Sequence, residues 1–296
     1  MFDIIIIGAG PAGLTAALYA GRANKKVLVL EAKAYGGQII NSLNIENYPG
    51  ILSISGFDYA TNLYNQVIDL DVSIKMERVV SIEEGFKVYT SQSVYEAKSI
   101  IIATGVQNRK LDLDHEDEWI GKGISYCATC DGAFFKNKVV AVQGGGNTAL
   151  EDALYLSNIA KKVYLIHRRD HFRGEEKYIR EVMNCDSIEV LYNSTITAIL
   201  GDDHVQGIEV HSKDQSIEIP VDGLFIAIGH VPQNECFQNV ITLDDEGYVL
   251  SSDGVHTSHS KIYVAGDTRV KELRQLTTAV SDGAMAATMA IKEMED

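Results

Sequence analysis

A glycine-rich pattern, present in two copies and preceded each time by an apolar run, is the feature that most restricts how this chain folds. The first copy, Gly8-Ala9-Gly10-Pro11-Ala12-Gly13, follows the β-branched run 3–7 and leads into a helical stretch from Leu14 to about Asn24. A second apolar run, 26–30, comes after the helix. Such glycines let the backbone approach a pyrophosphate, and the N-terminus of the helix stabilises its charge. The pattern therefore predicts a βαβ unit of a Rossmann-like α/β fold.

The second copy lies in the middle of the chain and has the same organisation. The motif Gly144-Gly145-Gly146-Asn147-Thr148-Ala149 follows the apolar run 138–142. A helical stretch to about Ile159 separates this motif from another apolar run, 162–166. Alanine is permitted at the last position of the fingerprint. We therefore expect an α/β protein with two Rossmann-like dinucleotide-binding domains.

The two copies differ in the residue that ends the second strand, at positions equally spaced from their glycine turns. The first copy has Glu31, whereas the second has His167, Arg168 and Arg169, with Arg173 one turn later. A carboxylate accepts hydrogen bonds from ribose hydroxyls but repels a 2′-phosphate, which guanidinium groups bind in bidentate fashion. We therefore expect FAD at the first site and NADPH at the second. The alternative is that the arginines are solvated surface residues.

Two further segments are typical of strands that contact a flavin. Residues 100–105 end in Ala103-Thr104-Gly105, and residues 261–267 end in Ala265-Gly266-Asp267. Ligands of α/β sheets lie at the carboxyl ends of the strands, so Thr104, Gly105 and Asp267 are candidate FAD contacts. Asp267 is suited to accept hydrogen bonds from the ribityl hydroxyls. A helix N-cap is the alternative interpretation of Asp267, and spacing alone does not separate the two.

The chain has four cysteines, and only Cys127 and Cys130 are close in sequence. Two cysteines without a second pair do not complete a zinc site, so we expect no metal. In a Cys-x-x-Cys pair, one thiol attacks a partner disulfide and the other resolves the mixed disulfide. Asp131 is a candidate proton donor if burial raises its pKa, and otherwise a turn or cap residue. Two buried, unreactive thiols are the alternative for the pair, and we interpret Cys185 and Cys236 as bystanders.

Length and charge exclude several classes of protein. A chain of 296 residues corresponds to two domains at roughly 150 residues each. The net charge of -15 repels nucleic acids and anionic membranes. No apolar stretch approaches the ~20 residues that span a bilayer. The opening residues lack the basic region of a targeting peptide. We therefore expect a cytoplasmic protein.

Over essentially its whole length the chain resembles the low-molecular-weight, prokaryotic-type thioredoxin reductases, which are class II pyridine nucleotide-disulfide oxidoreductases. The resemblance rests on both glycine motifs and on the arginine cluster. It also rests on the following segments: Gly36-Gly37-Gln38, Glu46-Asn47-Tyr48-Pro49-Gly50, Cys127-Ala128-Thr129-Cys130-Asp131-Gly132, Ala265-Gly266-Asp267 and Arg274-Gln275-Leu276-Thr277-Thr278-Ala279.

The resemblance implies a discontinuous FAD-binding domain, residues 1–110 and 237–296, with an inserted NADPH-binding domain, residues 111–236, that carries the redox pair. It implies that electrons pass from NADPH through FAD to the pair, and then to the disulfide of thioredoxin. Cys130 is then the sulfur next to the flavin, Cys127 attacks the partner and Asp131 is the acid. The resemblance also implies a homodimer. The further FAD-site residues that it implies are Gly36, Gly37, Gln38, Asn47, Arg274 and Gln275.

Other functions share parts of this pattern. The chain can serve another thioredoxin- or glutaredoxin-like carrier, or act as an NAD(P)H oxidase. Peroxide-linked relatives carry an extra N-terminal redox domain, which we do not expect because the first strand begins at residue 3. A ferredoxin-fed reductase should lack the arginines of the second site. The two cysteines and the complete second fingerprint argue against a flavin-binding protein without catalytic activity.

Overall fold

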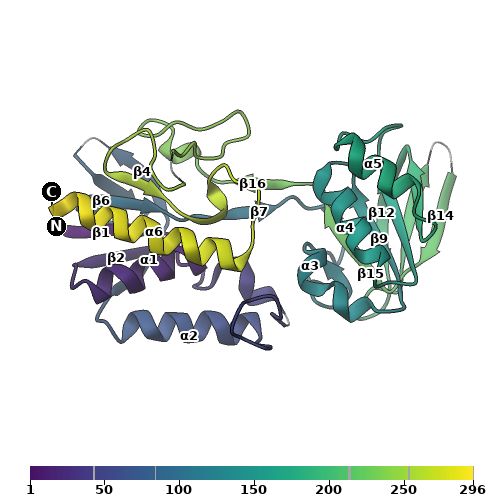
Figure 1. Cartoon of the computed structure of the whole chain (residues 1–296), viewed down its shortest axis with the longest axis horizontal. Helices are drawn as coiled ribbons and strands as arrows, with labels where there is room; N and C mark the ends of the chain where they lie inside the picture. The colour runs from purple at the N-terminus through teal and green to yellow at the C-terminus, as the bar shows by residue number, and fades with distance from the viewer. Residues whose placement is uncertain (43, 84, 213–214, 253, 296) are drawn as a thin grey trace. The chain divides into compact units, whose positions relative to one another are not determined.

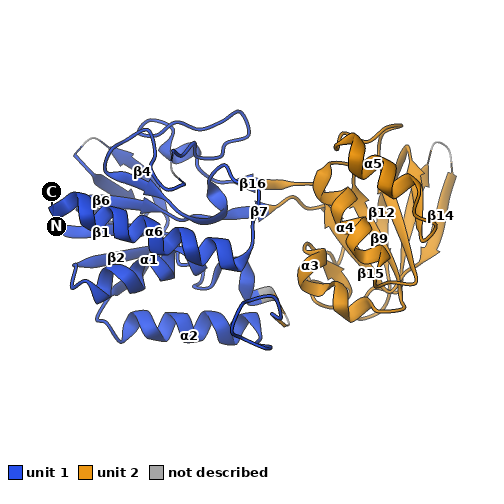
Figure 2. Cartoon of the chain, viewed as in Figure 1, with its two compact units in different colours: residues 1–41, 45–107, 231–296 blue, residues 42–44, 108–230 orange. Residues whose placement is uncertain are grey.

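The computed structural model describes residues 1–42, 44–83, 85–212, 215–252 and 254–295, and the chain forms two compact units (Figure 2). Unit 1 comprises residues 1–41, 45–107 and 231–296, and unit 2 comprises residues 42–44 and 108–230. We had expected the boundaries at residues 110 and 236. The chain divides earlier at the second boundary because the segment before 237 packs in unit 1. There, Asn234 is fully buried and donates to the carbonyls of Gly247 and Thr268, at 2.9 and 3.2 Å.

The described part of unit 1 is built on a seven-stranded sheet. Parallel pairing gives the order β3-β2-β1-β6-β17, and β5 and β4 extend the sheet in antiparallel fashion from the first half of β6. Figure 1 labels β1, β2, β4 and β6 of this sheet. The strands are β1 (Phe2–Ile7), β2 (Val27–Glu31), β3 (Ser73–Met76), β4 (Val79–Glu83), β5 (Lys87–Thr90), β6 (Val94–Ile102) and β17 (Ile262–Val264).

Both faces of this sheet are buried, which explains why its central strands are almost continuously apolar. Along β1, Ile4 and Ile6 belong to the core beneath the helices α1 (Pro11–Arg22), α2 (Gly56–Ile68) and α6 (Leu276–Glu295). Ile5 and Ile7 alternate with them and pack in a second core with Phe237. Burying each such side chain contributes about 1.5–3 kcal/mol relative to leaving it exposed.

Unit 2 contains a five-stranded parallel sheet in the order β11-β10-β9-β15-β8 and a three-stranded antiparallel sheet, β12-β13-β14. The parallel strands are β8 (Ile124–Ser125), β9 (Val139–Gly144), β10 (Lys162–His167), β11 (Ile188–Tyr192) and β15 (Gly223–Ala227). The antiparallel strands are β12 (Ser194–Leu200), β13 (Gly207–Ser212) and β14 (Gln215–Pro220). The helices are α3 (Ala128–Asp131), α4 (Asn147–Ser157) and α5 (Glu176–Met183).

The parallel sheet of unit 2 is also covered on both sides. Val140 and Val142 of β9 pack with α4 and α5, whereas Ala141 points into the core shared with the antiparallel sheet. Short 3-10 segments complete the chain, namely η1 (Gly37–Asn41), η2 (Gly132–Phe135), η3 (Glu235–Phe237) and η4 (Gly266–Thr268). The chain passes between the units through β7 (Val106–Asn108) and β16 (His230–Pro232), which pair with each other (Figure 1). In the described ranges, no helix combines the length and the apolar character needed to cross a bilayer.

Candidate active site and cofactor sites

The first glycine turn connects β1 to α1 by a path that only glycine allows. Gly8 has a φ of 107°, and a Cβ there would lie 2.3 Å from the carbonyl oxygen of Ala103. A Cβ on Gly13 would lie 1.9 Å from the oxygen of Gly8. Helix α1 begins at Pro11, earlier than the expected Leu14, because proline at the first helical position gives up an N–H that has no partner there. Gly10, the N-cap, has no side chain to cap the helix, so the N-terminal amides remain available to an anion.

The acid at the end of β2 lies against this turn. Glu31 Oε2 accepts a hydrogen bond of 2.7 Å from the N–H of Ala9, and Ala9 in turn accepts one of 2.8 Å from the N–H of Gly36. A Cβ on Gly37 would lie 3.3 Å from the Cα of Gly10. The segments that contain Glu31, Gly36 and Gly37 are therefore brought to the glycine turn, as expected for one dinucleotide site.

Two of the predicted cofactor contacts, Ala12 and Thr104, are packed or hydrogen-bonded within the protein. Ala12 is buried, and a Cβ on Gly283 of α6 would lie 2.1 Å from its carbonyl oxygen. The Thr104 hydroxyl donates to Asn234 Oδ1 at 3.1 Å and lies 2.8 Å from the Thr268 hydroxyl. The network of Thr104, Asn234 and Thr268 was not predicted, because its members are far apart in sequence. Gly105, with a φ of 65° and no atom within 4 Å of an added Cβ, borders open space.

Asp267 has an unused acceptor at the carboxyl end of β17. It lies in η4, and α6 begins only at Leu276, so the alternative of an N-cap of that helix is wrong. Its Oδ1 is buried and accepts no hydrogen bond from the residues that the structure describes. Burial raises the pKa of Asp267, and the charges of Lys271 and Arg274 offset this only in part. A buried acceptor without a donor is rare in proteins and suits a hydroxyl of a bound ligand.

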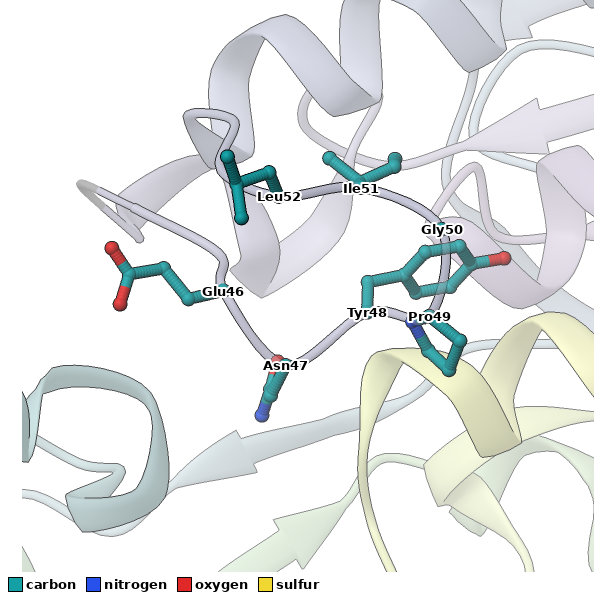
Figure 3. A pocket seen from close by; sticks show the side chains of 7 residues that line it. All are labelled: Glu46, Asn47, Tyr48, Pro49, Gly50, Ile51 and Leu52. Carbon is teal, nitrogen blue, oxygen red and sulfur yellow. The ribbon is translucent and has the colours of Figure 1, made fainter.

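Other residues predicted for the FAD site lie near Asp267 or β7. Arg274 Nε donates to the Asp267 carbonyl at 3.3 Å, and its guanidinium lies 4.4 Å from the centre of the Tyr248 ring. Asn47 Nδ2 donates to Gln275 Oε1 at 3.1 Å. Gln38 Nε2 donates to the carbonyl of Val106. The loop that carries Asn47, residues 46–52, lines an open recess of about 480 Å³ (Figure 3).

The second glycine turn connects β9 to α4 and has the same character. A Cβ on Gly144 would lie 2.4 Å from the carbonyl oxygen of Ala227, whereas no atom lies within 4 Å of a Cβ on Gly146. Asn147 Oδ1 accepts from the N–H of Glu175 at 2.7 Å, which joins the start of α4 to the start of α5. Thr148 is exposed in the first turn of α4. The turn therefore leaves an open face at Gly146 and Thr148.

The arginines of the second site have exposed side chains that are available to bind a ligand. Among the residues that the structure describes, the side chains of Arg168, Arg169 and Arg173 form no hydrogen bond or ion pair. His167 beside them is buried, and its Nε2 lies 3.0 Å from the carbonyl oxygen of His171. Burial, together with the charges of the arginines, lowers the pKa of His167 and so favours the neutral ring. Three cations without partners in an acidic protein indicate an anion site.

Cys127 and Cys130 form a disulfide across α3, with their Cα atoms 5.3 Å apart. Asp131 is the last residue of this helix, and its Oδ2 accepts a hydrogen bond of 2.6 Å from the Ser125 hydroxyl. Burial raises the pKa of Asp131, and the Ser125 bond lowers it by less. The raised pKa is the condition under which Asp131 was expected to act as an acid. Ser125 was not singled out from the sequence, because a serine two residues before a cysteine has no distinctive pattern.

The remaining cysteines are not part of a disulfide. Cys185 is a free thiol 3.3 Å from the hydroxyl of Ser187, and Cys236 is a free thiol whose pKa burial raises. A second unpredicted contact supports the segment before the disulfide. Glu116 is buried and accepts from the Tyr126 hydroxyl at 2.6 Å and from the N–H of Leu111 at 3.0 Å. This contact fixes the approach of the chain to Cys127.

Comparisons with known proteins agree in both sequence and structure. The profile of the pyridine nucleotide-disulphide oxidoreductase family matches residues 2–283. The chain is 41% identical over 302 residues to the thioredoxin reductase of Listeria monocytogenes, covering 100% of this chain and 95% of that protein. It is 41% identical over 292 residues to the thioredoxin reductase of Treponema pallidum, covering 97% and 95%. The structure matches thioredoxin reductase from Streptococcus pyogenes with a TM-score of 0.94 at 39% identity, covering 100% of this chain and 98% of the other.

Proposed function

The chain belongs to the pyridine nucleotide-disulphide oxidoreductase family, and we propose that it is a thioredoxin-disulfide reductase that uses NADPH and FAD. The observation that carries this function is the Cys127–Cys130 disulfide next in sequence to the half-buried Asp131. A disulfide next to an acid of raised pKa can exchange electrons and protons together. Relatives named thioredoxin reductase match this chain over nearly its whole length.

We propose that unit 1 binds FAD. The glycine turn offers backbone N–H groups to the pyrophosphate, and Glu31 ends β2 at the place of the adenosine ribose. The Oδ1 of Asp267, which lies 3.9 Å from Lys271 Nζ and accepts no hydrogen bond from the described residues, would accept one from a ribityl hydroxyl. When bound, FAD supplies a carrier that accepts a hydride equivalent from NADPH and passes two electrons to a disulfide.

We propose that unit 2 binds NADPH through its glycine turn and its arginines. The exposed side chains of Arg168, Arg169 and Arg173 would hold the 2′-phosphate, against the net charge of -15 of the chain. Guanidinium groups bind phosphate in bidentate fashion, which distinguishes NADPH from NADH. The open face at Gly146 would admit the pyrophosphate.

The cysteines then pass the electrons on by disulfide exchange. Reduction of the Cys127–Cys130 disulfide by two electrons and two protons gives two thiols. The thiolate of Cys127 attacks one sulfur of the thioredoxin disulfide, so that a mixed disulfide forms and the other thioredoxin sulfur leaves as a thiolate. Asp131 holds the proton for the departing sulfur. Cys130 attacks the sulfur of Cys127, closes the original disulfide and releases reduced thioredoxin.

We further propose that the enzyme is a cytoplasmic homodimer, as the resemblance to low-molecular-weight thioredoxin reductases implies. An acidic, disulfide-exchanging enzyme is suited to a compartment in which thiols are kept reduced. Sedimentation equilibrium of the purified protein tests the assembly: a mass of one chain at micromolar concentration contradicts it. Fractionation of the producing cells tests the location.

The function is tested by NADPH-dependent reduction of thioredoxin, measured in the wild type and in Cys127→Ser and Cys130→Ser. We expect both variants to keep flavin reduction by NADPH and to lose thioredoxin turnover. Cys185→Ser is the matched control, since this thiol lies outside the pair, and it should turn over normally. Normal turnover in either pair variant contradicts the relay. NADPH consumption with oxygen alone, and no reduction of thioredoxin, identifies an oxidase instead.

A further inference from the structure

The hydroxyl of Ser125 joins the carboxyl of Asp131 to the backbone of Cys127. Its Oγ lies 2.6 Å from Asp131 Oδ2, accepts from the N–H of Cys127 at 3.0 Å and lies 3.3 Å from the carbonyl oxygen of Cys127. A hydroxyl has one proton to donate. The carboxylate receives it, because the distance is shorter and a hydrogen bond to a charged oxygen is the stronger one.

Asp131 depends on this contact. In the described part of the chain, Ser125 is the sole hydrogen-bond donor to the Asp131 carboxylate. Asp131 also occupies the N-cap position of η2, but its side chain makes no capping hydrogen bond. The donor itself is well fixed, since Ser125 ends β8, is 3% exposed and pairs with Phe225 of β15. One donor on a rigid strand therefore selects one orientation of the carboxyl.

We propose that Ser125 is a positioning residue for the disulfide exchange, which holds the Asp131 carboxyl in the orientation from which it exchanges a proton with the sulfurs of the pair. The inference rests on the proposed function, in which Asp131 is the acid. Ser125 makes and breaks no covalent bond, and its hydroxyl keeps its own proton throughout. The same hydroxyl accepts a hydrogen bond from the N–H of Cys127, so one side chain holds both the Asp131 carboxyl and the start of α3.

Few groups set the proton affinity of Asp131. Burial raises its pKa, and the Ser125 bond lowers it. Helix α4, which packs against α3, carries Glu151 and Asp152. Burial and the charge of Glu151 raise the pKa of Asp152 to about 7, but neither residue contributes to the shift at Asp131.

Two further groups lie in the segment between β8 and the end of α3, namely Tyr126 and the disulfide itself. The Tyr126 hydroxyl donates a hydrogen bond to the buried Glu116, which keeps that carboxylate engaged elsewhere. The sulfurs of Cys127 and Cys130 carry charge only after reduction. In the oxidised enzyme, loss of the Ser125 hydroxyl therefore has one direct electrostatic effect, a further rise in the pKa of Asp131.

The test is Ser125→Ala in the full-length, FAD-loaded enzyme. We expect flavin reduction by NADPH at the wild-type rate and thioredoxin turnover about tenfold lower at pH 7, because the acid is no longer held in place. The alkaline midpoint of turnover should move to higher pH, since Asp131 keeps its proton longer. Ser125→Thr, which retains a hydroxyl, should restore the midpoint. An unshifted midpoint in Ser125→Ala, with or without a lower melting temperature, overturns the inference.

A double-mutant comparison separates positioning from a general structural role. Asp131→Asn removes the proton donor, so adding Ser125→Ala to it should change turnover by less than about twofold. Effects that multiply would show that Ser125 acts independently of Asp131 and would overturn the inference. If Asp131→Asn alone has no effect, or the wild type does not reduce thioredoxin, the proposed function fails instead.

Discussion

A Cβ atom on Gly145 would lie 2.1 Å from Nδ1 of His167, so the second glycine turn is in direct contact with the end of β10. The contact is reinforced on the backbone, where the N–H of Arg173 donates to the carbonyl of Gly145 at 2.8 Å. The imidazole is buried between the turn and the arginine segment. The glycine turn and the segment that carries the arginines are therefore held together through one ring, as are the two phosphate sites that we propose there.

We expect Gly145→Ala to displace His167 and to lower both stability and NADPH affinity. Overpacking of this kind costs about 1–3 kcal/mol. Gly146→Ala is the matched variant, because no atom lies within 4 Å of a Cβ at this position. It should melt at the wild-type temperature but bind NADP⁺ more weakly, since the Cβ would face the pyrophosphate at the site that we propose. Melting curves and NADP⁺ titrations check both, and equal losses of melting temperature contradict the interpretation.

We expect Arg168→Ala, Arg169→Ala and Arg173→Ala each to raise the KM for NADPH by about tenfold or more, while the KM for NADH changes little. A hydrogen bond between charged groups contributes about 1.5–3 kcal/mol, which corresponds to this factor. The melting temperature should not change, because these side chains have no partner among the described residues. Arg180→Ala is the control, since Arg180 is exposed on α5 and contacts Glu176, with Nε 3.8 Å from Oε1 and 3.3 Å from the carbonyl oxygen. Equal effects on both coenzymes would count against a 2′-phosphate site.

The parts of the fold that could be predicted are those marked by a pattern of residues close together in the sequence. The glycine turns were found because a close backbone approach requires glycine, and the structure has this approach at Gly8 and Gly144. The helices nevertheless begin earlier than expected, at Pro11 and Asn147, because the turn itself forms their first residues. From the sequence, a raised pKa of Asp131 could be named only as a requirement for its role as an acid, because burial cannot be read from a sequence.

The parts that could not be predicted depend on partners far along the chain. Asn234 bonds Thr104 across 130 positions, and no local pattern marks either residue as half of a pair. Ser125 could be recognised as part of the site only from the structure, in which β8 and α3 bring its hydroxyl to the carboxyl of Asp131. The antiparallel sheet β12-β14 was not anticipated either, because its strands carry polar side chains on their exposed face and give a weak apolar signal.

We expect Asp282→Asn to lower the free energy of unfolding by about 3 kcal/mol at pH 7. Asp282 is buried on α6 and accepts from Arg269 Nε at 2.9 Å and from Lys271 Nζ at 2.8 Å, so the substitution removes the carboxylate that neutralises two largely buried cations. Urea unfolding measures the effect. Asp117→Asn is the control, since Asp117 is exposed and its pair with Lys110 should contribute little.

The same carboxylate predicts an acid dependence. Although burial alone raises the pKa of Asp282, the bonds from Arg269 and Lys271 outweigh it and lower the pKa. Its contribution is then fully present above the ordinary aspartate value of about 3.9 and is lost as the pH falls through the lower, folded value. The difference between wild type and Asp282→Asn should therefore shrink below about pH 4. A difference that grows on acidification contradicts the lowered pKa.

We expect Asp267→Asn to weaken FAD binding by about tenfold while leaving the flavin-free protein at least as stable as the wild type. Its Oδ1 is buried, lies 3.9 Å from Lys271 Nζ and accepts no hydrogen bond from the described residues. In the absence of flavin, the nearby cations therefore offset its desolvation only in part, and a flavin hydroxyl would supply the missing hydrogen bond. Because burial raises the pKa of Asp267, the stability lost to its ionisation appears as the pH rises through the folded value.

The advantage of the flavin-free Asp267→Asn protein over the flavin-free wild type should therefore widen from pH 4 to pH 7. Equilibrium dialysis of FAD and urea unfolding of the flavin-free proteins measure the two effects separately. Lys271 still has Asp282 as a partner in the variant, at 2.8 Å, so no new buried cation is left unpaired. A variant that loses stability without flavin and retains wild-type FAD affinity would show that the carboxylate serves the fold and not the cofactor.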